Sequence, residues 1–252
     1  MSSRRPLVAG NWKMHGNRAD TAALVGAIRT GVGTVSVAEV AVCPPFILIP
    51  LVAEKLSGSP VFWGGQNLST HKFGAYTGEI SGTMLKDFGC TYVIVGHSER
   101  RTLYGENDSL VAEKYGAAQA ADLIPILCVG ETLQERYSNL TEDVVARQLD
   151  AVLSAHGVRS FKKAVIAYEP VWAIGTGKTA TPAQAQEVHR FIRGRLAVMD
   201  KSVADSVRIL YGGSMKASSA SELLAQPDID GGLVGGASLQ ADEFLAISRA
   251  AK

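Results

Sequence analysis

The sequence predicts an α/β protein in which residues 1–252 form a single domain, a closed (β/α)8 barrel of eight parallel strands. The main observation is that short apolar segments alternate with longer amphipathic ones along the whole chain. Neither a Pro/Gly-rich linker nor a Gly-x-Gly-x-x-Gly turn after the first strand interrupts this order, which disfavours an open doubly wound sheet. The expected strands are Leu7–Gly10, Val40–Cys43, Val61–Gly64, Tyr92–Val95, Ile124–Val129, Ala164–Tyr168, Arg208–Tyr211 and Gly231–Val234.

The segments between these strands carry helical patterns. The clearest follows the sixth strand, where Thr181 can cap a helix, Pro182 suits its first position and Gln184 completes a capping box. Further helices are expected after Asn107 and from Thr141. The apolar stripes, at three- and four-residue spacing, are Ala185, Val188, Ile192, Leu196 and Met199 in the first helix, Val111, Tyr115 and Ala118 in the second, and Val145, Leu149 and Val152 in the third.

Charge and cysteine content limit the function classes. The 25 basic and 24 acidic residues leave a net charge of +1 and form no blocks, so neither a nucleic acid nor a membrane surface is expected as a partner. No apolar stretch reaches the length of a transmembrane span, and the run after Arg4 and Arg5 is cut by Asn11 and Lys13. The three cysteines, Cys43, Cys90 and Cys128, are odd in number, lack metal-ligand spacing and in two cases lie in or beside apolar runs, as reduced core cysteines do. A reducing, cytoplasmic location is therefore expected.

Polar and glycine residues follow five of the expected strands. Because chemistry in such a barrel belongs at the carboxyl ends of its strands, these residues are expected to converge on one rim. Each has a structural explanation of its own: Lys13 as a solvated loop lysine, His97 as a core histidine satisfied by the backbone, Glu169 as an acid at a helix N-terminus. Their joint occurrence favours a functional site. The rim segments are Asn11-Trp12-Lys13, Gly96-His97-Ser98-Glu99-Arg100-Arg101, Glu169, Gly212-Gly213-Ser214 and Gly235-Gly236-Ala237-Ser238.

Glu169 stands directly at the end of the sixth strand. Pro170 restricts its backbone, so the carboxylate is expected to face a crevice. The next residues combine the stiff apolar pair Val171 and Trp172 with a small, glycine-bearing centre at 173–177. This composition predicts a lid that closes over an acid or a base.

The glycine pairs after the last two strands predict an anion site. Unobstructed backbone N–H groups at the start of a short helix bind phosphate at this position of the barrel, and Gly175 of the lid adds a donor. A phosphorylated small molecule would then place its other end near Lys13, His97 and Glu169. A base, a hydrogen-bond donor and a cation around a short carbon chain suit proton abstraction next to a carbonyl, and this chemistry needs no metal, nucleotide or other cofactor.

The other titratable residues are expected to have no catalytic role. Cys128, at the end of the fifth strand, should pack in the core, because no histidine or asparagine accompanies it locally. Surface or interface positions are expected for His15, His71, His156 and His189.

The chain contains, in order, Asn11-Trp-Lys-Met14, Gln66-Asn67, Thr77-Gly-Glu-Ile-Ser81, Val95-Gly-His-Ser-Glu-Arg-Arg101, Cys128-Val-Gly-Glu131, Ala167-Tyr-Glu-Pro-Val-Trp-Ala-Ile-Gly-Thr-Gly-Lys178, Tyr211-Gly-Gly-Ser214 and Leu233-Val-Gly-Gly-Ala-Ser238. Together these strings resemble the triosephosphate isomerase family over essentially the whole chain. The resemblance implies a TIM barrel and a cytoplasmic homodimer. It also implies interconversion of dihydroxyacetone phosphate and glyceraldehyde 3-phosphate, in glycolysis and gluconeogenesis, without a cofactor.

The resemblance also implies residue roles. Glu169 is the shuttling base, His97 the neutral electrophile, Lys13 the cation and Asn11 its polar partner. Lys13 is expected to stay charged beside Glu99. The phosphate-binding positions are Gly175, Ser214, Gly235 and Gly236. The loop 67–79 enters the neighbouring subunit, where Thr77 reaches toward the partner's site.

Three positions depart from the family pattern. His15 stands in place of the usual asparagine, Gly82 in place of proline and Met215 in place of valine. None of them replaces a chemical group, so they concern the interface and helix packing.

Two other functions remain open at this stage. One is a lyase of the same fold in which Lys13 forms a Schiff base with a ketose phosphate, although an imine-forming lysine needs desolvation. The other is a protein that binds phosphate without catalysis, which the intact set of Glu169, His97 and Lys13 disfavours.

Overall fold

The computed structural model describes residues 4–174 and 179–251. Its strands are all parallel and close into a barrel in chain order, which confirms the predicted (β/α)8 TIM barrel. The first strand pairs with the last, and Leu7 lies opposite Gly231. The strands are β1 (Leu7–Asn11), β2 (Glu39–Cys43), β3 (Val61–Gly65), β4 (Tyr92–Val95), β5 (Ile124–Val129), β6 (Val165–Tyr168), β7 (Arg208–Tyr211) and β8 (Gly231–Val234), each within one residue of its expected bounds.

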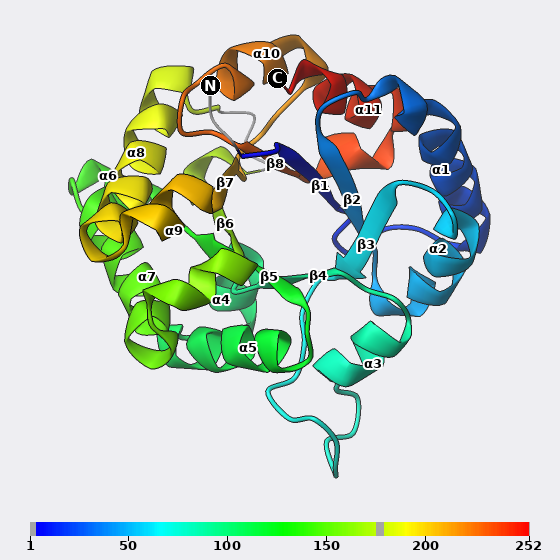
Figure 1. The fold of residues 1–252 in the computed structure, drawn as a ribbon, viewed down its shortest axis with the longest axis horizontal. Coiled ribbons are helices and arrows are strands. Elements are labelled where there is room, and N and C mark those ends of the chain that lie inside the picture. Colours follow the sequence, from blue (N-terminus) through cyan, green and yellow to red (C-terminus); the bar gives the residue numbers. More distant parts are fainter. Residues whose placement is uncertain (1–3, 175–178, 252) are drawn as a thin grey trace.

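The helices form a ring outside the strands, as Figure 1 shows. The predicted capping box at Thr181 is present: its hydroxyl accepts the N–H of Gln184 at 3.2 Å, and its N–H donates to the Gln184 side chain at 3.0 Å. The described helices are α1 (Arg18–Gly31), α2 (Ile49–Leu56), α3 (Gly82–Asp87), α4 (Ser98–Tyr104), α5 (Asp108–Ala120), α6 (Leu133–Tyr137), α7 (Thr141–His156), α8 (Pro182–Met199), α9 (Lys201–Ser206), α10 (Ala217–Leu224) and α11 (Ala241–Ala250).

Two expectations for α8 are wrong. Met199 is 54% exposed, because it is the last residue of the helix. His189 is fully buried, with Nδ1 3.1 Å from the carbonyl oxygen of Asp228. It follows Val188 and lies on the same buried face as Ala185 and Ile192. The face of the helix therefore decides its burial, despite its polar ring.

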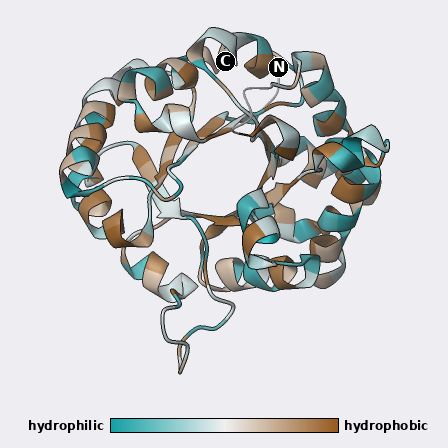
Figure 2. Cartoon of the chain, turned by 180° about the vertical axis from the view of Figure 1, so that it is seen from behind, coloured by the Kyte–Doolittle hydropathy of each residue, from teal (hydrophilic) through white to brown (hydrophobic). Residues whose placement is uncertain are grey.

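The apolar side chains form two layers. Residues alternate along each strand, so Leu7 and Ala9 point into the barrel while Val8 packs against the surrounding helices. Figure 2 shows the strands coloured mostly as hydrophobic and the helices as a mixture of both classes. The interior layer comprises Leu7, Ala9, Ala41, Cys43, Tyr92, Ile94, Ile126, Cys128, Val165, Ala167, Leu210 and Leu233. This rigid interior supports the side chains at the strand ends.

The loop between β3 and α3 projects from the barrel, as Figure 1 shows at its lower edge. A bridge between Ser69 and Ser81 joins the two sides of its base, and the N–H of Ser69 donates to the carbonyl of Ile80 at 2.8 Å. The outer part is exposed, including Thr77 and the aromatic Phe73, which is 81% exposed. The loop thus presents apolar and polar side chains away from its own barrel.

Gly82 begins α3 at a crowded point of the structure. A Cβ at this position would lie 2.7 Å from the Cβ of Ala121 and 3.3 Å from Leu68. This close contact explains why glycine stands where the family pattern has proline, since proline also carries a Cβ.

Candidate active site

Glu169 lies at the carboxyl end of β6 and is anchored by its backbone. Its N–H donates to the carbonyl of Val129 at 2.8 Å, which continues the sheet by one residue. Two glycines make room for it: a Cβ on Gly130 would lie 1.8 Å from the Glu169 carbonyl oxygen, and one on Gly212 would lie 2.9 Å from its Cγ. The carboxylate is consequently fixed in a site where the residue is only 2% exposed.

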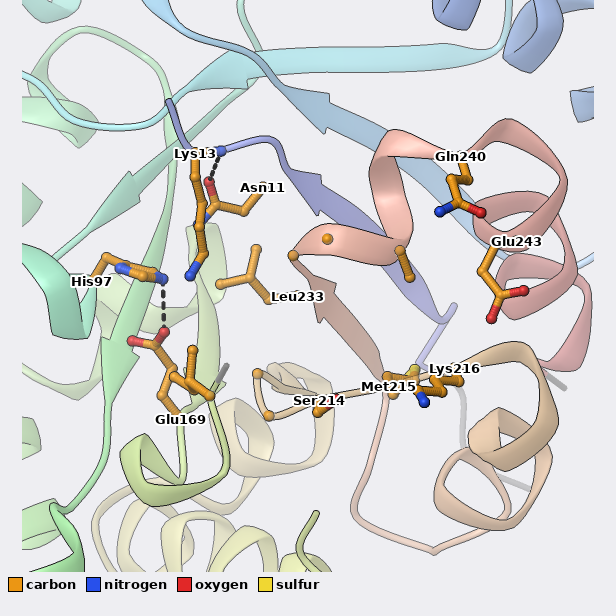
Figure 3. A pocket seen from close by; sticks show the side chains of 16 residues that line it. Asn11, Lys13, His97, Glu169, Ser214, Met215, Lys216, Leu233, Gln240 and Glu243 are labelled. Atoms are coloured by element: carbon orange, nitrogen blue, oxygen red, sulfur yellow. Dashed lines mark hydrogen bonds and ion pairs between the residues drawn. The ribbon is translucent and has the colours of Figure 1, made fainter. Parts of the chain in front are cut away.

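Both carboxylate oxygens of Glu169 have partners. The N–H of Ser98 donates to Oε2 at 3.0 Å and its hydroxyl donates to Oε1 at 3.3 Å. Nε2 of His97 lies 2.9 Å from Oε1, as drawn in Figure 3. Burial raises the pKa of Glu169, but His97 and the Ser98 N–H together outweigh burial and lower it. Glu169 is therefore ionised at neutral pH.

His97 caps the N-terminus of α4. Its Nδ1 accepts the N–H of Glu99 at 3.2 Å, which requires a lone pair on Nδ1 and leaves the proton on Nε2. Burial lowers the pKa of His97, whereas the charge of Glu169 raises it, and the net direction is upward. These two observations oppose each other. The helix N–H on Nδ1 identifies a neutral ring that donates from Nε2, and the upward shift depends on Glu169 remaining beside it.

Lys13 follows β1 in a left-handed backbone conformation, with φ of 52°. Such a conformation is uncommon for a residue with a side chain, and it is stabilised by Asn11, whose Oδ1 accepts the Lys13 N–H at 3.1 Å. The Lys13 ammonium lies 2.5 Å from a carboxylate oxygen of Glu99. Lys13 is therefore held in place at both its backbone and its side chain.

A cavity of about 470 Å³ joins the rim residues that the sequence predicts. Asn11, Lys13, His97 and Glu169 line one end, and Ser214 lies toward the other, as Figure 3 shows. Gly235 and Gly236 also line the cavity, and a Cβ on Gly235 would lie 3.6 Å from Cε of Lys13. The remaining lining residues include Gly212, Gly213, Met215, Lys216, Gln240 and Glu243. Gly175 and the centre of the expected lid lie outside the described residues.

The glycine-rich end of the cavity offers unused backbone donors. Among residues 4–174 and 179–251, the N–H groups of Ser214, Gly235 and Gly236 have no hydrogen-bond acceptor. These N–H groups are therefore available to a ligand. The carbonyl of Gly235 is meanwhile held by the N–H of Ser238 at 2.8 Å and its hydroxyl at 2.6 Å. A fixed cluster of donors of this kind suits an anion such as phosphate.

Other expected residues are placed away from this cavity. Thr77 is exposed on the projecting loop and does not line the cavity within its own subunit. Cys128 is fully buried in the barrel interior, and burial raises the pKa of its thiol well above the usual value. A thiolate nucleophile is therefore disfavoured at this position. His15, His71 and His156 are exposed, as expected.

The sequence reasoning assigned no role to three residues that hold the site together. Ser98 fixes Glu169, and Gln66 donates to the carbonyls of Lys13 at 2.8 Å and Cys43 at 2.9 Å. Glu131, fully buried, accepts the indole N–H of Trp172 at 2.9 Å. It thereby anchors the segment that enters the expected lid. Gln66 and Glu131 have no signal in the sequence beyond the strings that resemble the family, and Ser98 has in addition only its place after the fourth strand. Contacts between distant residues have no local pattern.

Two kinds of feature are absent from the described part of the chain. Residues 4–174 and 179–251 contain no cluster of three or more histidine, cysteine, aspartate or glutamate side chains able to hold a metal ion. No helix within these ranges is both long and apolar enough to cross a membrane.

The fold and site define a class of protein: a TIM-barrel enzyme whose buried carboxylate and imidazole share a cavity with a lysine and a group of backbone N–H donors at the carboxyl ends of the strands. The family model of triosephosphate isomerase matches residues 6–251, and the chain belongs to that family.

Proteins named triosephosphate isomerase show the same relationship over nearly full length. That of Thiobacillus denitrificans is 64% identical over 248 residues, which cover 98% of this chain and 99% of the relative. That of Nitrosococcus oceani is 62% identical with the same coverage. That of Nitrosomonas eutropha is 58% identical over 250 residues, or 99% of each chain.

Proposed function

We propose that this chain interconverts dihydroxyacetone phosphate and D-glyceraldehyde 3-phosphate, a step of glycolysis and gluconeogenesis, by proton transfer through an enediolate. The single observation that carries the proposal is the buried, ionised Glu169 beside the Nε2 donor of His97 at one end of the cavity. The backbone N–H donors that also line the cavity would bind the phosphate group of the same substrate.

The proposed mechanism begins with substrate binding. The phosphate accepts hydrogen bonds from the N–H groups of Ser214, Gly235 and Gly236, with Gly175 as a further donor. With the phosphate bound there, the carbonyl group and the carbons of the substrate lie toward Asn11 and Lys13. We propose that no cofactor or metal takes part, because a base, a hydrogen-bond donor and a cation together supply the proton transfer and the charge stabilisation.

Proton transfer follows at the other end. Glu169 removes a proton from the carbon next to the carbonyl and returns it to the neighbouring carbon. Negative charge that develops on the oxygens is stabilised by Nε2–H of His97 and the ammonium of Lys13. His97 gives its Nε2 proton to the carbonyl oxygen and regains a proton from the hydroxyl oxygen on the carbon that Glu169 deprotonates, so that one O–H bond is broken and one is formed. In this structure His97 and Ser98 contact the carboxylate oxygens of Glu169. Glu169 therefore has to break these hydrogen bonds before a carboxylate oxygen can accept the substrate proton. The alternative role of Lys13 as a Schiff-base nucleophile is disfavoured by its ion pair with Glu99 at 2.5 Å.

Assembly is the second part of the proposal. We propose a homodimer with C2 symmetry in which the loop 67–79 of each subunit enters the other near His15, and in which Thr77 reaches toward the partner's site. Exposed apolar side chains support this assembly: Met14 is 93% exposed and Phe73 is 81% exposed. The whole chain, residues 1–252, acts as one barrel domain within that dimer. The three free, buried cysteines are consistent with a cytoplasmic location.

The test uses dihydroxyacetone phosphate in deuterated water with no metal or nucleotide. The expected product is glyceraldehyde 3-phosphate that carries carbon-bound deuterium, because a carboxylate exchanges its captured proton with solvent. Borohydride added during turnover should label no protein. Covalent labelling at Lys13 would instead identify a lyase, and unexchanged substrate with well-folded protein would identify a binder without catalysis.

A further inference from the structure

The charges that line the cavity are unevenly paired. At the catalytic end, Lys13 lies 2.5 Å from Glu99, so its charge is largely balanced. Glu169 is ionised and faces a neutral His97 ring. The catalytic end therefore carries excess negative charge before any substrate arrives. A phosphate ester with about −1.5 to −2 charges at neutral pH must bind against that excess.

The far end of the cavity holds a second cation. Lys216 lines it, two residues after Ser214, at the residue that precedes α10. Among the residues that the structure describes, no carboxylate lies within ion-pair distance of its ammonium. The backbone of Lys216 is fixed, because its carbonyl accepts the N–H of Ala220 at 2.9 Å. Figure 3 shows Lys216 beside Met215, on the opposite side of the cavity from Glu169.

The neighbouring acid is held by another partner. Glu243 also lines this end, and its Oε1 accepts the N–H of Ala217 at 2.7 Å. That N–H belongs to the first residue of α10, where the helix favours a negative group. Part of the Glu243 charge is thus compensated by the helix. The charge of Lys216 remains available to a ligand.

We infer that Lys216 is a specificity-determining residue, whose charge attracts the phosphate dianion and orients it away from Glu169. This inference rests on the proposed function. The N–H groups of Ser214, Gly235 and Gly236 can donate hydrogen bonds to the phosphate but carry no full charge. Lys216 carries a full positive charge, which attracts the phosphate even without a direct hydrogen bond to it. Its effect acts through space, so it should appear in binding and in the association rate and leave the chemical step nearly unchanged.

The sharpest variant is Lys216→Gln, which removes the charge and keeps most of the length. The KM for glyceraldehyde 3-phosphate should rise about fivefold with kcat nearly constant, which is the factor expected for an ammonium and a phosphate dianion about 8 Å apart in water. Lys216→Arg should retain the wild-type KM. Glu243→Gln, which keeps the acceptor for Ala217, should lower KM, and this opposite sign is specific to an electrostatic role. Lys162→Gln, an exposed lysine in the turn before β6, is the charge-matched control.

Salt dependence and direct binding complete the test. Between about 0.01 and 0.2 M ionic strength, kcat/KM of the wild type should fall more steeply than that of Lys216→Gln, because salt screens the attraction. Calorimetry with inorganic phosphate should give about fivefold weaker binding to Lys216→Gln, at an unchanged melting temperature. Equal KM, salt dependence and phosphate affinity in Lys216→Gln and Lys162→Gln would overturn the inference. A wild type that binds phosphate without isomerising would overturn the proposed function and leave the phosphate test of Lys216 intact.

Discussion

Ser98 holds both oxygens of Glu169, with its N–H 3.0 Å from Oε2 and its hydroxyl 3.3 Å from Oε1. The two residues lie 71 positions apart, and β4 and β6 bring them together across β5. The proposed base is therefore stored in a fully hydrogen-bonded position. Catalysis then requires exchange of these bonds, so the side chain must have the correct length for both positions.

Glu169→Asp tests the reach of the base. Shortening the side chain by one methylene moves the carboxylate by about 1 Å, which is expected to lower kcat on the order of a hundredfold while KM changes much less. Steady-state kinetics in both directions measure the effect, with the exposed Glu113→Asp as a control. Activity within a few-fold of wild type would remove Glu169 from the role of base.

His189 gives a pH dependence to stability. Burial lowers its pKa from the ordinary histidine value of 6.5 to about 4. Between these values the unfolded chain binds a proton that the folded chain excludes, so stability falls as pH is lowered from 6.5 to 4 and is fully present above 6.5. The difference corresponds to about 3 kcal/mol in the free energy of unfolding.

His189→Asn removes this titration and retains an N–H donor for the carbonyl of Asp228. Urea unfolding at several pH values should show a shallower loss of stability in the variant between pH 6.5 and 4. A variant with the same pH slope as wild type would show that His189 does not contribute to acid sensitivity.

Thr77→Arg tests the proposed dimer. A long charged side chain on the exposed loop should not fit inside a partner subunit, so the expected protein is a monomer with little activity. Light scattering and activity at the same concentration measure both properties. Thr30→Arg, on the exposed face of α1, should remain dimeric and active. A fully active Thr77→Arg monomer would contradict the proposal that the dimer completes the site.

Gly82→Ala tests the packing of α3. Its Cβ would lie 2.7 Å from Ala121, so the variant should lose about 1 to 3 kcal/mol of unfolding free energy, although alanine usually favours a helix. The double variant with Ala121→Gly should recover part of this loss, which a double-mutant cycle measures by chemical denaturation. Additive effects of the two substitutions would show that this contact is not the cause.

The sequence predicted strand positions well because each strand is a short apolar run between turn residues. Tyr92–Val95 and Ile124–Val129 have the expected bounds. The polar ring of His189 predicts an exposed position, but its place on the buried face of α8 decides its burial. The residues that meet at the rim could also be predicted, because they directly follow the carboxyl ends of the strands. Partners such as Ser98 and Gln66 could not be predicted, since their bonds depend on closure of the barrel and not on local pattern.

Pairing of β1 with β8 has a consequence for synthesis of the chain on the ribosome. The partner of Leu7 is Gly231, so almost the entire polypeptide must be translated before β1 has both neighbours. At about 5 to 20 residues per second, the nascent chain spends roughly 10 to 45 s with one edge of its first strand unpaired. An unpaired strand edge is a template for association with other chains. Chaperone capture during translation, which shields that edge until the eighth strand emerges, would therefore protect this protein at its most vulnerable stage.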